Sequence, residues 1–327
     1  MHLWKGNSQD NLLIHGALIL CKHQRMSILK RFNKPEYFYR PAQVLKAIGS
    51  HRLYDKAEEI VEMPWGLPVA VNPTETIGRA ILRLGVYDLC VSETICRLLD
   101  PGENAIDVGA NLGYMTSLMA AKVGDGGSVE SFEPHPELYA KLMSNAGRWR
   151  AKGLECTLSI ALMALSSHDG IATLRVPEDF KDNQGLASLE RYEEGEGIVV
   201  ATRRLDAVVK MKNIALMKID VEGHELQVLV GAEALLANHQ IRDILFEEEG
   251  IYPTKASDYL EKHGYKIYGL GMRFGGPIIA DGSVINEVPR REWEPKSLLA
   301  TCAGDRAEGR FHSTGWSVLR PILQRAE

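Results

Sequence analysis

The sequence lacks an excess of basic charge, a regular spacing of cysteines and a hydrophobic run long enough to cross a bilayer. Its 327 residues include 38 basic and 43 acidic side chains, for a net charge of −5. This balance argues against nucleic acid as a partner, and an acidic substrate would need a local basic pocket. The five cysteines show no Cys-x-x-Cys or Cys/His ligand spacing. We therefore expect no structural zinc site, no disulfide framework and a reducing, cytoplasmic setting.

The apolar run at residues 12–21 could be mistaken for a targeting segment. It contains His15 and has neither a basic region before it nor a small-residue cleavage site after it. It is also too short, because a bilayer span needs about 20 apolar residues. We therefore predict part of a buried N-terminal helix and no stable membrane insertion. A homo-oligomer stays open.

The chain divides into three zones. Residues 1–60 form an extension with clustered basic and aromatic side chains, as in Tyr37–Arg40. We predict a helical arm or lid here, with a surface that helps to bind an anionic or sugar-bearing substrate as the alternative. Residues 61–303 form the main domain and residues 304–327 a C-terminal tail. The sequence contains no internal repeat and no low-complexity tract.

Strand and helix patterns alternate through the main domain. The predicted strands are residues 60–63, 67–71, 104–108, 128–133, a stretch within 155–161, 171–176, 199–203, 214–221, 241–247, 266–270 and 298–300. The predicted helices are residues 88–99, 113–123, 136–149, 224–236 and 255–263. Several strands lack clean alternation, as expected where both faces are covered. The pattern predicts an α/β fold with a doubly wound, mostly parallel sheet.

A glycine-containing loop joins Asp107, at the end of one predicted strand, to the next helix. Gly109 and Gly113 bracket this turn, where glycine permits a positive φ and a close approach of the backbone to a ligand. The helix that follows offers unpaired N–H groups and a positive dipole end. The spacing Gly-x-Asn-x-Gly differs from the Gly-x-Gly-x-x-Gly loop that holds a dinucleotide pyrophosphate. It favours a nucleotide-type cofactor without phosphate, and Asp107 suits a cationic one.

Glu133 ends the following strand, at a suitable distance after this loop. A carboxylate here can accept hydrogen bonds from both ribose hydroxyls of an adenosine, each contributing about 1.5–3 kcal/mol. Enzymes that use NAD also place an acidic residue at this position. Glu133 therefore supports an adenosine-containing cofactor, whereas the loop composition is what disfavours NAD.

With these residues and those that follow, the chain resembles the FkbM family of S-adenosylmethionine methyltransferases from about residue 60 to about residue 301. The matching segments are Ile106–Tyr114, Phe132–Pro134, Ala164–Ser166, Arg204–Asp206, Lys218–Glu225, Leu229–Ala232 and Glu247, with Leu298–Ala300 as the closing strand. The run Lys218–Glu225 is the most specific of them. His224 departs from the family, which commonly has a small residue there, and the extension before residue 60 is not covered.

The resemblance implies a class I methyltransferase fold, which is Rossmann-like, with a seven-stranded sheet. It also implies O-methylation of a hydroxyl on a small molecule, sugar, lipid-linked glycan or natural product. S-adenosylmethionine would be the cofactor and S-adenosylhomocysteine the product. The cofactor-binding residues expected on this basis are Asp107, Gly109, Asn111, Gly113, Glu133, Ala164, Leu165 and Asp220.

Asp220, Glu222 and His224 are the candidate catalytic residues. Asp220 ends a strand at the edge where open α/β sheets bind ligands. Each of the three could take the proton of the acceptor hydroxyl or orient it. Alternatively, the two carboxylates cap the next helix or are solvated, and Lys218 pairs with Glu247. The same groups could hold a divalent metal, but their spacing does not establish such a site, so we predict no metal ligand.

Two irregular segments, residues 180–196 and 272–294, are predicted to line the acceptor site, because long loops in compact domains are often functional. Tyr114 and Tyr192 are candidate contacts there. Two other functional classes stay open. One is an NAD-dependent oxidoreductase or epimerase, which would need the missing glycine pattern. The other is a non-catalytic module that keeps the fold and binds the cofactor without turnover.

Overall fold

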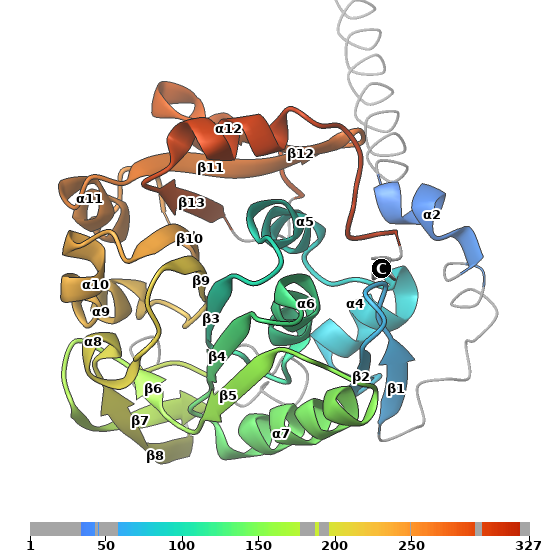
Figure 1. The fold of residues 1–327 in the computed structure, drawn as a ribbon, viewed down its shortest axis with the longest axis horizontal. Coiled ribbons are helices and arrows are strands. Elements are labelled where there is room, and N and C mark those ends of the chain that lie inside the picture. Colours follow the sequence, from blue (N-terminus) through green and yellow to red (C-terminus); the bar gives the residue numbers. More distant parts are fainter. Residues whose placement is uncertain are drawn as a thin grey trace, which may run out of the picture.

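An eight-stranded sheet lies at the centre of the molecule (Figure 1). The computed structural model describes residues 34–42, 45, 58–176, 187–189, 196–248, 250–291 and 296–320. The strands of this sheet are β3 (Asn104–Val108), β4 (Ser128–Phe132), β5 (Thr157–Ala161), β9 (Ile214–Ile219), β10 (Ile241–Glu247), β11 (Lys266–Arg273), β12 (Gly276–Ala280) and β13 (Ser297–Thr301). Their spatial order is β12-β11-β13-β10-β9-β3-β4-β5.

The five strands β5, β4, β3, β9 and β10 are parallel to one another, and the three others pair antiparallel. After β5 the chain returns to the middle of the sheet and adds β9 beside β3. This reversal makes the carboxyl ends of β3 and β9 a topological switch point, where open α/β sheets bind ligands. The predicted class I, doubly wound, mostly parallel sheet is confirmed. β12 adds an eighth strand inside the segment 272–294, for which the prediction of irregular structure was therefore wrong in part.

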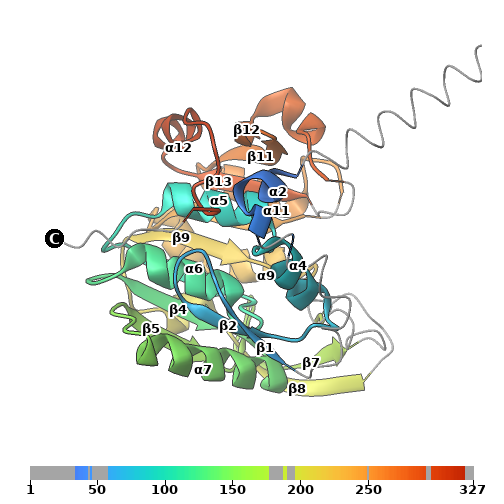
Figure 2. The same cartoon turned by 90° about the vertical axis from the view of Figure 1, so that its right-hand side faces the viewer.

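Helices cover both faces of the sheet (Figures 1 and 2). One face carries α5 (Leu89–Leu98), α6 (Tyr114–Val123) and α7 (Pro136–Ala151), and the other carries α8 (Leu205–Val208), α9 (Glu225–Val230), α10 (Glu233–Ala237) and α11 (Lys255–Lys262). The side chains of β9 supply both hydrophobic cores: Leu216 belongs to the first, whereas Met217 and Ile219 belong to the second. All six residues of β9 are buried, which explains why its sequence is apolar except for Lys218.

Two smaller sheets flank this core. β1 (Glu59–Glu62) and β2 (Pro68–Val71) form the predicted antiparallel pair. β6 (Ala164–Leu165), β8 (Glu196–Arg203) and β7 (Gly170–Val176) form a three-stranded sheet in that order. Three further helices are α2 (Pro35–Tyr39), α4 (Thr76–Leu84) and α12 (Gly304–Phe311). The first lies in the predicted extension and the last in the predicted tail, whereas α4 was not predicted.

The predicted helix 224–236 is two helices, α9 and α10, that meet at Gly231. A Cβ on Gly231 would stand 2.1 Å from the carbonyl oxygen of Ser166, so only glycine fits where these segments touch. The carboxylate of Asp206 then accepts hydrogen bonds from the backbone N–H groups of Ala234 and Leu235, at 2.9 and 3.1 Å. These bonds stabilise the new N-terminus of α10. The motif Arg204–Asp206 therefore has a structural role here.

The N-terminal extension contributes α2, which packs against the main domain at several points. Its ring Phe38 contacts Phe274 edge-on at 6.1 Å between centroids, and the side chain of Arg40 donates to the carbonyl of Gly85 at 3.2 Å. The apolar run 12–21 lies outside the described residues, as does most of the remaining part of the predicted arm. In the part of the chain that the structure describes, no helix combines the length and apolarity needed to cross a membrane.

Candidate active site

A cavity of about 1020 Å³ opens at the carboxyl ends of the parallel strands. This volume is at the upper end of the range of about 300–1,000 Å³ for small-molecule sites, so it can hold a nucleoside cofactor together with a second molecule. Its lining combines the loop after β3, the ends of β4, β9 and β10, strand β6, the segment 76–89, and parts of α2 and α11. The predicted site residues can each be placed relative to it.

The glycine loop after β3 has the predicted positive φ at both glycines, and each glycine packs against a different part of the protein. Gly109 has φ +77°, and a Cβ there would lie 1.9 Å from the carbonyl oxygen of Asp220. Gly113 has φ +94°, and its Cβ would meet Leu142 at 2.4 Å. Both glycines therefore permit close packing within the protein. Gly109 and Asn111 line the cavity, whereas Gly113 does not.

Asp107 lies behind the cavity wall and is fully buried. Its Oδ2 accepts a 2.6 Å hydrogen bond from the hydroxyl of Thr116, and its Oδ1 has no hydrogen-bond partner among the described residues. Burial raises the pKa of Asp107, while Lys218 and Thr116 act in the opposite direction. The structure therefore gives Asp107 no direct place on the cavity surface, unlike the position expected beneath a bound amino group.

Glu133 faces the cavity at the end of β4. Its two oxygens accept hydrogen bonds from the backbone N–H groups of Asn111 and His135, both at 2.8 Å. A carboxylate has about four lone-pair sites, so each oxygen keeps acceptor capacity for a ligand hydroxyl. Burial raises the pKa of Glu133 to about 7, although the two N–H groups favour the ionised form. Glu133 thus binds the glycine loop to β4 and presents an acceptor to the cavity.

Asp220 and Lys218 form an ion pair on the cavity wall. Lys218 Nζ donates to Asp220 Oδ2 at 2.9 Å. Burial alone would lower the pKa of Lys218, but Asp220 and Asp107 outweigh it and raise that pKa. Glu247, at the end of the adjacent strand, also lines the cavity. Lys218 therefore pairs with Asp220 and not, as predicted, with Glu247. The charge of Glu247 still acts on both Lys218 and Asp220.

Glu222 and His224 follow Asp220 in the lining. Glu222 has φ +52°, and its carbonyl accepts a 2.7 Å hydrogen bond from the hydroxyl of Ser188. His224 is buried, and its Nε2 is 3.0 Å from the hydroxyl of Ser166. This contact fixes the imidazole against the strand–loop junction after β6. In the turn before helix α9, the backbone N–H groups of Val221 and Gly223 donate to the carboxylate of Glu225. Glu225 therefore caps the start of this helix, a role predicted as an alternative for Asp220 and Glu222.

Of the other predicted contacts, some line the cavity and some lie outside the described residues. Ala164 and Leu165 form β6 and line the cavity, as does Tyr114. The hydroxyl of Tyr114 is buried and accepts from the backbone N–H of Tyr87 at 3.0 Å. Tyr192 and most of the segment 180–196 lie outside the described residues, although Ala187 belongs to the lining. Across the residues that the structure does describe, no group of three or more His, Cys, Asp or Glu side chains is arranged to hold a metal ion.

Sequence reasoning missed a group of lining residues that lie outside the motifs. Asp88 caps α5 by accepting from the N–H of Val91 at 3.0 Å and has φ +39°. The aromatic ring of Tyr87 precedes it. Glu36 of α2 pairs with Arg291 through two bonds of 2.7 and 2.8 Å, and all four residues line the cavity. A helix-cap pattern before residue 89 was readable, but its position beside Asp220 was not.

Residues 107–267 match the family model described as Methyltransferase FkbM domain. The matched range begins at the end of β3 and includes both Glu133 and Asp220. This part of the chain is therefore similar to FkbM methyltransferase domains. Its cavity is nevertheless completed by α2, the segment 76–89 and Arg291, which all lie outside the matched range.

Two curated proteins are similar to parts of this chain. One is the 31-O-demethyl-FK506 methyltransferase FkbM of Streptomyces tacrolimicus, which is 34% identical over 160 residues, 41% of this chain and 61% of that protein. The other is Methyltransferase 1 of Beauveria bassiana, which is 27% identical over 184 residues, 50% of this chain and 72% of that protein. The chain thus spans less than two thirds of the Streptomyces protein.

Solved structures with a similar arrangement include methyltransferase FkbM from Methylobacillus flagellatus. It is 15% identical, with a TM-score of 0.35, over 68% of this chain and 52% of that chain. A SAM-dependent O-methyltransferase from Thermotoga maritima is also 15% identical, with a TM-score of 0.38, over 74% of this chain and 77% of that chain.

Proposed function

We propose that this protein is an S-adenosylmethionine-dependent O-methyltransferase that acts on a hydroxyl of a small molecule, sugar or natural product. The observation that carries the proposal is the position of Glu133 and Asp220 in one cavity, at the switch point of a sheet within an FkbM domain. Bound S-adenosylmethionine supplies an electrophilic methyl group. The protein must then position the acceptor, exclude water and remove a proton.

The residues present fit this cofactor in three respects. The acceptor capacity of Glu133 suits the ribose hydroxyls, and Asn111 lies next to it in the loop. Ala164 and Leu165 offer an apolar surface for the adenine ring. Carboxylates at the ends of β9 and β10 suit a sulfonium cation. Asp107 would act indirectly, by helping to hold Lys218 and Thr116 in place.

Asp220 is our candidate for orienting the acceptor hydroxyl. Lys218 fixes one of its oxygens and leaves the other able to accept a hydrogen bond. The hydroxyl proton then passes to one of the carboxylates that surround the reacting atoms. His224 serves as a positioning residue in this scheme, because its Nε2 contacts Ser166. Glu222 contributes a cavity-lining carboxylate next to Asp220.

Isothermal titration with S-adenosylmethionine and S-adenosylhomocysteine tests the proposal. We expect both to bind, and Glu133→Ala to weaken both by about 100-fold, since it removes two hydrogen bonds to a charged group. Glu130→Ala is the matched control, because Glu130 lies on the same strand outside the cavity lining. A folded wild-type protein that binds neither compound contradicts the proposal. Binding of NAD instead would favour the oxidoreductase class.

A further inference from the structure

Negative charge dominates the cavity wall. The acidic side chains of the lining are Glu36, Asp88, Glu133, Asp220, Glu222, Glu225, Glu247 and Glu248, and its basic side chains are Lys218, Lys255 and Arg291. Two of these three cations are already paired with carboxylates, Lys218 with Asp220 and Arg291 with Glu36. Lys255 is exposed at the start of α11. The excess of carboxylates therefore acts on whatever occupies the cavity.

Glu247 is the carboxylate most directly available to a ligand. It is half-buried and lines the cavity, and its side chain accepts no hydrogen bond within the described ranges. Burial, followed by the charges of Asp220 and Asp88, raises its pKa well above the ordinary value. Its carboxylate oxygens are therefore left to the cavity rather than used by the fold. Glu247 is thus arranged to meet a group that the ligands supply.

The backbone around the cavity also carries strain. Five described non-glycine residues have positive φ, and three of them, Asp88, Asn111 and Glu222, line the cavity. Such conformations persist where the surrounding structure imposes them, and they concentrate at ligand sites. At Asp88 the strained turn places a carboxyl group close enough to Glu247 and Asp220 for their charges to act on one another.

We infer that Asp88 and Glu247 form an anion-excluding wall at the methyl-transfer point, which selects a cationic cofactor and an acceptor without negative charge. This inference rests on the proposed function and adds the charge of the acceptor, which the proposed function does not specify. Like charges brought together without solvent repel strongly, so a phosphate or carboxylate near the reacting hydroxyl would weaken acceptor binding. A sulfonium has the opposite effect, since it restores the balance of charge. The anionic-substrate alternative for the extension is therefore disfavoured at this end of the cavity.

The test compares three ligands that differ mainly in charge at the reacting position. These are S-adenosylmethionine, the neutral S-adenosylhomocysteine, and sinefungin, in which an amine-bearing carbon replaces the methylated sulfonium. Titration calorimetry measures each affinity for the wild type and for Asp88→Asn/Glu247→Gln. We expect the double variant to lose at least about tenfold in affinity for the two cations and to keep its affinity for S-adenosylhomocysteine. Asparagine retains both the helix cap and the left-handed conformation at residue 88.

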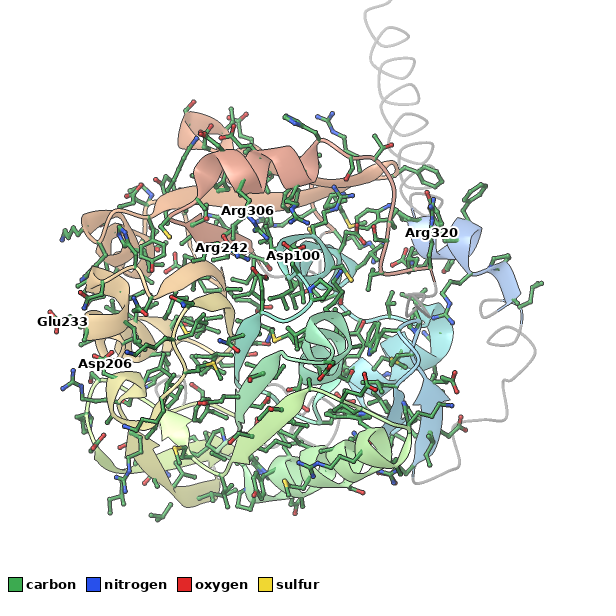
Figure 3. All side chains as sticks on the ribbon, viewed as in Figure 1. Asp100, Asp206, Glu233, Arg242, Arg306 and Arg320 are labelled. Atoms are coloured by element: carbon green, nitrogen blue, oxygen red, sulfur yellow. The ribbon has the colours of Figure 1, made fainter. Side chains whose placement is uncertain are left out.

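The matched control is Asp125→Asn/Glu233→Gln, which removes two exposed charges outside the cavity lining. Glu233 lies on the outer side of α10 (Figure 3). A cation-to-neutral affinity ratio that is the same in the wild type and in Asp88→Asn/Glu247→Gln overturns the inference. Failure of all three ligands to bind the wild type overturns the proposed function instead.

Pairs of alcohols that share a skeleton but differ in charge extend the test to the acceptor. Release of S-adenosylhomocysteine is followed for each neutral alcohol and for its phosphorylated or carboxylated counterpart. We expect turnover of the neutral members, and at least a tenfold gain for the anionic members in the neutralised variant relative to the wild type. Faster turnover of an anionic member by the wild type also overturns the inference.

Discussion

Carboxylates are paired with arginines at the amino edge of the central sheet, whereas they outnumber the cations at its carboxyl edge. At the amino edge, Arg242 donates hydrogen bonds to Glu103 and Asp243, and Arg306 donates to Asp243 and Asp100. Figure 3 shows Asp100, Arg242 and Arg306 gathered between α5, β10 and α12. Every one of these carboxylates has a guanidinium partner. This network ties the start of β10 to two helices, and its groups face one another rather than a cavity.

At the carboxyl edge, the carboxylates outnumber their cations. Lys218 serves Asp220, whereas Glu247 beside it accepts no hydrogen bond among the described residues. Buried charges that serve structure are expected to be paired, because desolvation is otherwise too costly. We therefore distinguish carboxylates that stabilise the fold from carboxylates that are available to bind a ligand. Three predictions test this distinction between structural and ligand-binding carboxylates.

The largest expected effect is on stability, from Asp243→Ala at the amino edge. Asp243 is fully buried between two arginines and also accepts from Thr301 at 2.6 Å. Removing one member of a buried pair typically costs about 3–5 kcal/mol. We expect a loss of this size in the free energy of unfolding, measured with urea, and an unchanged affinity for S-adenosylmethionine. Asp305→Ala, an exposed change on α12, should cost under about 0.5 kcal/mol. Weaker cofactor binding without a loss of stability would contradict the division.

Gly109→Ala should have a smaller effect on stability but a direct effect on the cavity. The added Cβ meets the carbonyl of Asp220, and residue 109 has φ +77°. Gly102→Ala is a close control, because Gly102 has φ +81° and nothing lies within 4 Å of its added Cβ. Both variants should lose about 1–2 kcal/mol from left-handed strain, and Gly109→Ala should lose more because its Cβ also meets a backbone oxygen. Only Gly109→Ala should also weaken binding of S-adenosylmethionine, by about tenfold or more in titration. Equal cofactor affinities in the two variants would show that this contact does not shape the site.

The smallest expected effect is a pH dependence of cofactor affinity. The groups acting on Glu247 are Asp220, Asp88 and Glu222, with Lys218 as the opposing cation. Below its raised pKa, Glu247 of the free protein holds a proton, which a cationic ligand displaces. Affinity for S-adenosylmethionine should therefore rise with pH between the pKa of Glu247 in the complex and its raised value in the free protein, by at most about tenfold per pH unit.

S-adenosylhomocysteine provides the control for that titration. Glu133, whose pKa is raised to about 7 by burial, affects both ligands through the ribose, so its titration cancels in the ratio of affinities. The ratio should rise with pH in the wild type and become flat in Glu247→Gln. A ratio that falls with pH would contradict the sign of the expected linkage.

The order of strands and helices was largely predictable from the sequence. β9, which is buried throughout, is a mainly apolar run, and Asp220 follows it directly. Glu133 follows β4, whose sequence Ser-Val-Glu-Ser-Phe mixes apolar and polar residues. Their common position at one edge then follows from parallel pairing. Among the elements that escaped prediction, β12 begins at Gly276 of the pair Gly275 and Gly276, which is typical of a loop. Another is α10, which begins where Gly231 meets Ser166.

The rest of the candidate site depends on contacts between distant segments. Glu36 and Arg291 are 255 positions apart, and no local pattern joins them. Asp88 was predicted only as the start of the helix 88–99, because tertiary packing alone places it near Asp220 and Glu247. Asp107 was predicted to lie under the cofactor, but the side chain turns to Thr116 behind the wall. Position along a strand can be read from the sequence, whereas the direction of a side chain at the end of that strand depends on its neighbours.

The hairpin before the matched domain has a consequence for any attempt to isolate that domain. Asn145 of α7 is fully buried, and its amide joins the backbone N–H of Ala70 to the carbonyl of Leu112, both at 2.9 Å. Trp149, one turn later, donates to the carbonyl of Pro68 at 2.7 Å. A fragment restricted to residues 107–267 would leave both α7 side chains with buried polar atoms that have lost a partner, next to the cofactor loop. The hairpin of β1 and β2 therefore supports the glycine loop, and any expressed fragment of this domain should include it.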